Sequence, residues 1–272
     1  MDDGRKVRIN MKPDYKNWMP KGMVLGFLAG AVVAVVLSVI AGYSNLFSGT
    51  TKTVLTVILV IISVVMVCMT IWGFLMYRAF DYNGSRRMSK QIIEGVASYV
   101  QIPDGGKCLD VGCGSGALSI AVAKRCPKAS IIGIDRWGKE YASFSKALCE
   151  NNAKAENVSN TSFRQGDATH LDFPDDTFDA VTSNYVYHNI PSKDRQSILV
   201  ETLRTLKKGG TFAIHDIFSA SKYGDMQSFV KKLKEMGYEK VELIDTTEGM
   251  FMKKSEAGWM GLSGSAILHG KK

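Results

Sequence analysis

The stretch Cys108-Leu109-Asp110-Val111-Gly112-Cys113-Gly114-Ser115-Gly116 places three glycines directly after a short, mostly apolar run. Glycine adopts a positive φ without strain and lets the backbone approach a ligand closely. Residues 117–125, which follow, have the pattern of a helix, and the first N–H groups of a helix can hold an anionic group. The stretch therefore predicts a strand, a tight glycine loop and a helix, with a ligand bound at the loop.

Helical and extended patterns alternate from residue 85 to the end of the chain. Alternating strands and helices indicate a mostly parallel sheet covered on both faces, with ligands at the carboxyl ends of the strands. We therefore predict an α/β fold: a doubly wound, Rossmann-like sheet of seven strands. The expected strands are 107–111, 130–135, 161–165, 179–183, 211–216, 240–245 and 264–270, and the expected helices are 85–100, 117–125, 138–153, 193–206 and 223–236.

Two uncharged apolar runs, 22–43 and 53–77, precede this domain. Each reaches the roughly 20 residues that a helix needs to cross a bilayer, so the sequence predicts a transmembrane hairpin. A cleaved signal peptide is the alternative, and the second run argues against it. The expected division is a basic tail at 1–21, the hairpin at 22–78 and the α/β domain at 79–272. Gly22, Gly26 and Gly30 favour close helix packing, either on the second run or on another protomer.

The formal net charge of +8 is concentrated beside the apolar runs. Residues 1–78 carry 8 Lys/Arg and 3 Asp/Glu, whereas the rest of the chain carries 26 and 23. Such a distribution gives no reason to expect a nucleic-acid partner. Because positive residues stay on the cytosolic side of a membrane, we expect an integral membrane protein with both termini and the α/β domain in the cytosol. The five cysteines have no metal-ligand spacing, so no metal is expected.

The glycine spacing by itself does not identify the ligand. Residues 112–117 also fit the dinucleotide fingerprint, and Asp135 lies at a suitable distance to bind ribose hydroxyls. Asp110, however, puts a carboxylate close to where a pyrophosphate would lie. A carboxylate repels phosphate and suits a cation, and S-adenosylmethionine carries an amino group and a sulfonium but no phosphate. An NAD-linked oxidoreductase remains the alternative, opposed by Asp110 and Asp167.

Five segments in order resemble the class I S-adenosylmethionine-dependent methyltransferases. They are LDVGCGSG at 109–116, IIGID at 131–135, Gly-Asp-Ala at 166–168, Phe-Asp-Ala-Val at 178–181 and Leu-Lys-Lys-Gly-Gly at 206–210. Lys208 stands where the family usually has proline. The resemblance covers about 85–272 and is nearest to the quinone-type and small-molecule branch. It implies that the last strand runs antiparallel to the others.

This resemblance implies S-adenosyl-L-methionine as the cofactor. Asp135 would bind the ribose hydroxyls and Asp167 the adenine amino group. Each aspartate also has a plainer interpretation, as a helix cap or a turn former. The expected cofactor residues are Asp110, Gly112, Gly114, Gly116, Asp135, Arg136, Asp167, Ala168 and Asn184.

The segment Ser183–Ile190 lies where enzymes of this class meet the methyl acceptor. His188 is the leading candidate for a catalytic base, and His215-Asp216 at the end of the fifth expected strand is the next. Either histidine could simply be packed in the fold, and Asp216 could cap the following helix. The segment lacks the Asn/Asp-Pro-Pro-Tyr/Phe pattern of nucleic-acid amino methylation. No nucleic-acid substrate is therefore expected.

Two features favour an acceptor at the membrane. Only about seven residues, 78–84, separate the second apolar run from the domain, which limits the separation to about 25 Å. The loop 248–262 is rich in Met, Phe and Trp and is expected to open on the cofactor face, although it could equally pack under the sheet edge. We therefore predict a membrane-anchored methyltransferase for a small, lipophilic acceptor. A non-catalytic membrane scaffold would be expected to have a broken first motif.

Overall fold

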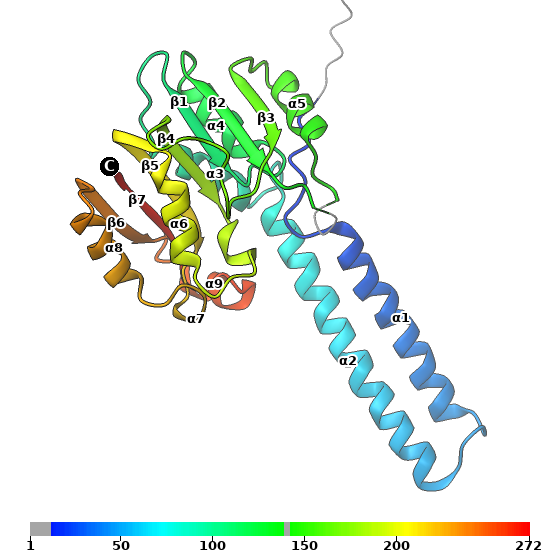
Figure 1. Cartoon of the computed structure of the whole chain (residues 1–272). Helices are drawn as coiled ribbons and strands as arrows, with labels where there is room; N and C mark the ends of the chain where they lie inside the picture. Colours follow the sequence, from blue (N-terminus) through cyan, green and yellow to red (C-terminus); the bar gives the residue numbers. More distant parts are fainter. Residues whose placement is uncertain (1–11, 139–141) are drawn as a thin grey trace, which may run out of the picture. The chain divides into compact units, whose positions relative to one another are not determined.

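The computed structural model describes residues 12–138 and 142–272 and divides the chain into two compact units (Figure 1). One unit is the helical segment Asn17–Lys90. The other unit combines the residues up to Lys16 with Gln91–Lys272. Residues on both sides of the helical segment therefore belong to the same folded unit.

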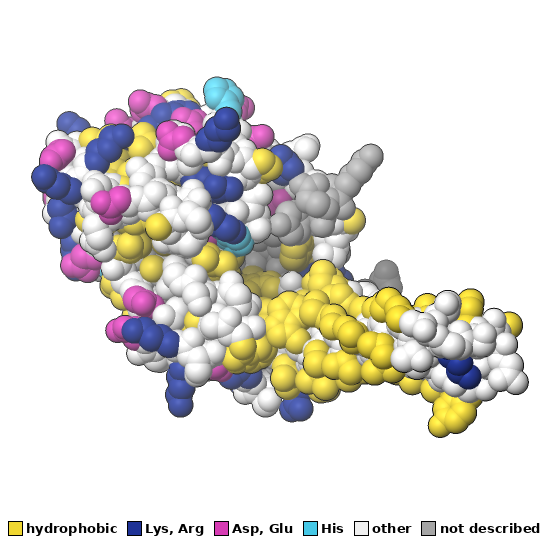
Figure 2. Space-filling view, turned by 90° about the horizontal axis from the view of Figure 1, so that it is seen from below, with side chains coloured by type: hydrophobic (Ala, Val, Ile, Leu, Met, Phe, Trp, Pro, Cys, Tyr) yellow, Lys and Arg dark blue, Asp and Glu magenta, His cyan; other side chains and the backbone are white. Residues whose placement is uncertain are grey.

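The helical unit is built from α1 (Lys21–Tyr43) and α2 (Gly49–Phe80). Both helices are long and apolar enough to cross a membrane, by length and composition. Their side chains form the continuous apolar surface that Figure 2 shows in yellow. No charged residue other than Lys52 lies between Lys21 and Arg78.

Small residues let α1 and α2 approach closely. A Cβ placed on Gly30 of α1 would lie 2.4 Å from Met66 Cε of α2, whereas Cβ positions at Gly22 and Gly26 meet no described atom within 4 Å. Ala31 and Ala34 are buried along the same helix. Among Gly22, Gly26 and Gly30, Gly30 is therefore the one that faces the second helix.

The domain unit contains a seven-stranded sheet in the order β3-β2-β1-β4-β5-β7-β6. All strand pairs are parallel except those of β7, which runs antiparallel between β5 and β6. The predicted fold class, including the antiparallel last strand, is confirmed. The strands are β1 (Lys107–Val111), β2 (Ser130–Asp135), β3 (Thr161–Gln165), β4 (Phe178–Asn184), β5 (Leu206–Ile217), β6 (Lys240–Asp245) and β7 (Ser265–Lys271).

The helices cover the sheet and bury its apolar side chains. Helices α4 and α5 pack against β2 and β3, α6 packs against β5, and α8 packs against β6 (Figure 1). The chain order of the strands reverses between β1 and β4, so their carboxyl ends form the position at which such sheets bind ligands. The helices are α3 (Met88–Ala97), α4 (Ala117–Arg125), α5 (Lys146–Ala155), η2 (Tyr187–Asn189), α6 (Arg195–Arg204), α7 (Ala220–Tyr223), α8 (Met226–Glu235) and α9 (Lys254–Met260).

Helix α5 begins at Lys146, whereas the sequence predicts a helix from about residue 138. Ser145 Oγ caps it by accepting a hydrogen bond from Leu148 N, and Trp137 has a positive φ of 42° that a helix does not allow. Residues 139–141 of the predicted helix lie outside the described residues. The described residues 142–145 are therefore not helical, in contrast to the prediction.

The loop expected at 248–262 contains the short helix α9. The pattern of apolar residues is too brief there to reveal a helix of seven residues. Lys253 N donates a hydrogen bond to Glu256 Oε2 at its start, and Gly261, with a φ of 71°, ends it. Strand β5 is also longer than predicted, because a β-bulge between Phe178 and Ala180 lets Leu206 pair before the turn.

Candidate active site

The glycine loop joins β1 to α4 and takes the conformation that its sequence predicts. Gly112, Gly114 and Gly116 have φ values of 72°, 55° and 81°. The N–H groups of Gly112 and Cys113 both donate to Ile134 O, at 2.8 and 2.9 Å, which ties the loop to the end of β2. A Cβ at Gly114 would meet no described atom within 4 Å. The backbone at Gly114 therefore borders open space.

Gly112 serves a different purpose from Gly114. A Cβ at Gly112 would lie 2.3 Å from Val186 Cγ2, closer than real Cβ atoms come. The absence of a side chain at this position lets the segment after β4 approach the glycine loop. The segment that carries His188 is thereby brought next to the loop.

Asp135 ends β2 and holds the glycine loop from the other side. Its Oδ2 accepts a hydrogen bond from Gly114 N at 2.9 Å, and its Oδ1 accepts one from Trp137 N at 2.7 Å. Trp137 Nε1 donates to Gly114 O at 3.0 Å. Each carboxylate oxygen retains a lone pair for a further donor. Arg136, the next predicted residue, is exposed at this strand end.

Asp167 lies in the turn that follows β3, next to the end of β2. Hydrogen bonds from Thr169 N and Oγ1 to its Oδ1, at 2.8 and 2.7 Å, hold the pKa of Asp167 below its usual value, and the nearby charge of Arg136 adds to this effect. The carboxylate is therefore ionised at neutral pH. It is exposed, and the adjoining Ala168 is half-buried.

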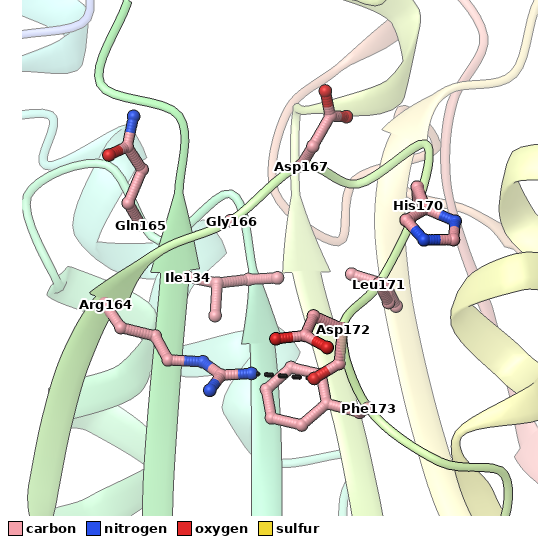
Figure 3. A pocket seen from close by; sticks show the side chains of 9 residues that line it. All are labelled: Ile134, Arg164, Gln165, Gly166, Asp167, His170, Leu171, Asp172 and Phe173. Atoms are coloured by element: carbon pink, nitrogen blue, oxygen red, sulfur yellow. Dashed lines mark hydrogen bonds between the residues drawn. The ribbon is translucent and has the colours of Figure 1, made fainter.

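A cavity of about 110 Å³ adjoins Asp167 (Figure 3). Ile134 and Phe173 border it, while the Asp167 side chain points away from it. Arg164 closes one side, where its guanidinium lies 4.0 Å from the centre of the Phe173 ring and donates to Asp172 O. Ligand pockets usually measure roughly 300–1,000 Å³. This cavity is therefore too small to hold a whole nucleoside cofactor.

Asp110 lies deeper than the sequence suggests. The side chain is 1% exposed, and its oxygens accept hydrogen bonds from Ser119 Oγ of α4 at 2.5 Å and from Thr182 Oγ1 of β4 at 3.0 Å. Burial raises the pKa of Asp110 to about 7, although both hydroxyl donors act to lower it. Asp110 thus links three elements beneath the glycine loop.

Asn184 and His215 occupy neighbouring strand ends, where β4 pairs with β5. His215 Nδ1 lies 2.8 Å from Asn184 Oδ1, and His215 Nε2 lies 3.1 Å from Thr246 Oγ1. His215 is fully buried, and this burial lowers its pKa to about 3. Both ring nitrogens of this neutral histidine form hydrogen bonds within the fold, so neither is available to a methyl acceptor.

His188 is paired with Asp216, which the sequence analysis placed beside His215 and did not connect with His188. His188 Nδ1 lies 2.5 Å from Asp216 Oδ1 at the end of β5. Asp216 is fully buried, and its Oδ2 also accepts from Tyr187 N at 2.8 Å and His188 N at 3.3 Å. Among the described residues, none lies within hydrogen-bond distance of His188 Nε2. The pair therefore has the arrangement of an oriented general base.

Aromatic rings lie beside the two histidines, His188 and His215. The Tyr185 ring lies 5.9 Å from that of His188 and 4.5 Å from that of His215, and the Phe251 ring lies 5.6 Å from His215, all between ring centroids. Tyr185 has a φ of 55°, a strained value for a tyrosine, and its hydroxyl lies 2.8 Å from Ser265 Oγ. Burial raises the pKa of Tyr185, so its hydroxyl stays protonated.

The segment 248–262 therefore reaches His215 through Phe251. Phe251, Met252 and Met260 are buried, whereas Met250 and Trp259 are 44% and 43% exposed. Most of the apolar side chains thus pack within the domain, and two remain at its surface.

Sequence reasoning missed the pairing of Asp216 with His188 and the contribution of Trp137 to this site. The available signal for Asp216 was its place at the end of β5, because β4 and β5 are neighbours and their ends meet. No comparable signal existed for Trp137, since its position depends on a positive φ in an irregular segment.

Similarities to known proteins agree with this geometry. A family model described as a methyltransferase domain matches residues 102–260. A demethylmenaquinone methyltransferase of Staphylococcus carnosus is 38% identical over 117 residues, which are 42% of this chain and 44% of that protein. An uncharacterized methyltransferase of Schizosaccharomyces pombe is 35% identical over 128 residues, 46% of this chain and 45% of that protein. The chain thus spans about half the length of the curated relatives it matches.

A solved structure supports the fold alone. The crystal structure of the cyclase SpnF has a TM-score of 0.52 and 21% sequence identity, and the match covers 71% of this chain and 85% of that chain. The match covers most of the cyclase, but at such low sequence identity it says nothing about activity.

The raised pKa of Asp110 predicts an unusual dependence of stability on pH. Between about pH 4 and 7 the folded protein retains a proton on Asp110 that the unfolded chain has released, so the free energy of unfolding falls as pH rises through this window. A pKa difference of about three corresponds to about 4 kcal/mol. Asp110→Asn removes this titration. Between pH 4 and 8 the Tm of the wild type should therefore fall by several degrees relative to the Tm of the Asp110→Asn variant. Parallel curves of Tm against pH for the two proteins would contradict this expectation.

Proposed function

The chain belongs to the family of methyltransferase domains, and from this membership we propose that it is a membrane-anchored methyltransferase for a small, lipophilic acceptor. S-adenosyl-L-methionine is its cofactor. The cofactor supplies a methyl group on a positively charged sulfonium, which is a strong electrophile. The protein has to bind and orient the two reactants, exclude water and accept a proton from the acceptor. The His188–Asp216 pair beside the glycine loop is the observation that carries the proposal.

The residues at the strand ends fit a cationic adenosine cofactor. The open space at Gly114 allows close approach to the backbone, and Asp135 retains acceptor capacity for ribose hydroxyls. In this proposal Arg136 and Ala168 bind the cofactor together with Asp167. Gly112, Gly116 and Asn184 support the loop and strand ends around them. Asp110 acts from below the loop, through Ser119 and Thr182.

His188 is the catalytic base in this proposal. Asp216 fixes the ring through Nδ1 and stabilises the imidazolium that forms when Nε2 accepts the acceptor's proton. The new bond joins the acceptor's nucleophilic atom to the methyl carbon as the bond from that carbon to sulfur breaks. His215 has a positioning role, because its burial keeps it neutral and both its nitrogens are engaged.

A lipophilic acceptor suits the apolar surroundings of this pair. Tyr185 and Phe251 provide aromatic surface next to the two histidines, and Met250 and Trp259 expose apolar surface on the segment that carries Phe251. The Staphylococcus carnosus relative is named for demethylmenaquinone, a quinone. We propose an acceptor of comparable character, with an aromatic or polar head and an apolar body.

Membrane anchoring by the α1–α2 hairpin explains how the enzyme reaches such an acceptor. The described residues before the hairpin and Gln91–Lys272 after it form one unit, so both flanks lie on one side of any membrane that the hairpin crosses. Basic residues in both flanks favour the cytosol for that side. The proposed organisation is a basic tail at 1–21, the hairpin at 22–78 and the catalytic domain at 79–272.

The acceptor proposal predicts where a labelled methyl group will appear. Purified full-length protein is incubated with methyl-labelled S-adenosylmethionine and either a membrane lipid extract or a soluble metabolite extract. Label is expected in the organic phase of the lipid reaction, because the acceptor is lipophilic. The His188→Gln protein is the control for transfer that does not depend on the site. Label confined to the aqueous products would overturn the lipophilic acceptor.

The His188–Asp216 pair predicts matched kinetic losses. His188→Gln and Asp216→Asn should each lower kcat by about 10²–10⁴-fold with little change in KM for the cofactor, because proton transfer is affected while cofactor contacts remain. His269→Gln is the matched control, since His269 contacts Glu242 on neighbouring strand β6. Wild-type kcat in the His188 variant would exclude this residue as the base.

The hairpin orientation predicts which positions a membrane-impermeant thiol reagent can reach. Single cysteines are introduced at Leu46, in the α1–α2 turn, and at Ser192, in the domain, in a background where native cysteines are replaced by serine or alanine. In intact cells Leu46→Cys should react from outside and Ser192→Cys only after lysis. The reverse pattern would show the opposite orientation. Equal protection of both positions in intact cells would mean that the hairpin does not cross the membrane.

A further inference from the structure

The short segment before the hairpin contacts the domain unit next to the glycine loop. We call residues 14–16 the strap. Asp14 N donates to Asn152 Oδ1 at 2.7 Å, and Asn152 Nδ2 donates back to Asp14 O at 2.9 Å. The same Nδ2 group donates to Ser115 O of the glycine loop at 2.9 Å. One amide on α5 therefore joins the backbone of the strap to the backbone of the loop.

Tyr15 anchors the strap. Its side chain is 5% exposed, and its hydroxyl donates to Glu156 Oε1 at 2.9 Å. Glu156 also pairs with Lys124 of α4 at 2.5 Å. The strap thus contacts α5 through Asn152 and the C-cap residue Glu156, and Lys124 connects Glu156 to α4, the helix that follows the glycine loop. Two independent contacts hold it there, one through its backbone and one through a buried aromatic ring.

The contacts of α5 orient the peptide groups of the glycine loop. Cys149 Sγ and Trp137 Nε1 both donate to Gly114 O, at 3.2 and 3.0 Å, and Asn152 donates to Ser115 O. In a planar trans peptide the following N–H points opposite to the carbonyl. Because Gly114 O is held toward these donors, the Ser115 N–H points away from them. Asn152 is 2% exposed, and the strap satisfies half of its hydrogen-bonding groups.

We propose that the strap and Asn152 are positioning elements that hold the glycine loop in its cofactor-binding conformation. The inference rests on the proposed function, since it concerns the same cofactor. By linkage, docking of the strap and binding of the cofactor strengthen each other. Helix α1 begins at Lys21, five residues after Lys16, so the strap is also the point at which the hairpin is connected to the cofactor site.

The test compares variants of the full-length protein in lipid nanodiscs, with S-adenosylhomocysteine as the probe in calorimetry. Tyr15→Ala removes the anchor without touching the core of the sheet, and Asn152→Asp keeps the shape of the side chain but removes both N–H donors. Each should raise Kd by about 5–150-fold, while kcat at saturating cofactor stays within about twofold of wild type. Tyr15→Phe, which keeps the ring, should restore most of the affinity. Lys12→Ala, at an exposed position, is the control.

Limited trypsin digestion supplies a second, reciprocal measurement. Saturating S-adenosylhomocysteine should slow cleavage of the Lys16–Asn17 bond relative to the Lys21–Gly22 bond, which lies outside the strap. The role of the strap would be overturned if Asn152→Asp weakened binding while Tyr15→Ala left the Kd within about twofold of the wild-type value. Unchanged cleavage together with unchanged affinity would overturn it as well. A wild-type protein that does not bind S-adenosylhomocysteine would overturn the proposed function itself.

Discussion

The hydrogen bonds that fasten the glycine loop to the end of β2 are the constraint on which the site depends. Ile134 O accepts from two consecutive N–H groups of the loop, and Asp135 accepts a third, so the loop is fixed by the neighbouring strand end. This works only because β1 and β2 are parallel and end at the same edge. Three positive φ values then follow from the tight turn, which is why glycine stands at each of those positions.

Burial divides the titratable groups of the site into two kinds. Asp110 and His215 lie inside the fold, where desolvation disfavours their charged forms, so they serve as uncharged or partly charged hydrogen-bonding partners. Asp167 stays exposed, and donors from its own turn favour its ionised form. Asp216 is buried too, and four nitrogen atoms lie within hydrogen-bond distance of its carboxyl oxygens. His188 is the histidine that retains a nitrogen for chemistry.

The sequence predicts those parts of the site that depend on local conformation. The strand β1, the glycine loop and α4 were predictable to the residue, because apolar pattern, glycine and helix propensity agree over a short span. The pairing of His188 with Asp216 joins residues 28 positions apart and depends on strand order, which no local pattern encodes. The buried position of Asp110 was not predictable either, since Ser119 and Thr182 reach it from two other elements. Trp137 depends on an irregular backbone.

In our proposal the strap connects the hairpin to the cofactor loop, a connection that a simple tether would lack. In the proposed arrangement the hairpin keeps the domain near the bilayer, and the five-residue step from Lys16 to Lys21 reaches at most about 18 Å. A tether of that length raises the effective concentration of a bilayer-borne acceptor without any contact to it. Because the strap also satisfies Asn152, which holds Ser115 O, the same short segment contributes to the shape of the cofactor loop. In this proposal membrane anchoring and cofactor affinity depend on the same residues, so both are expected to change together.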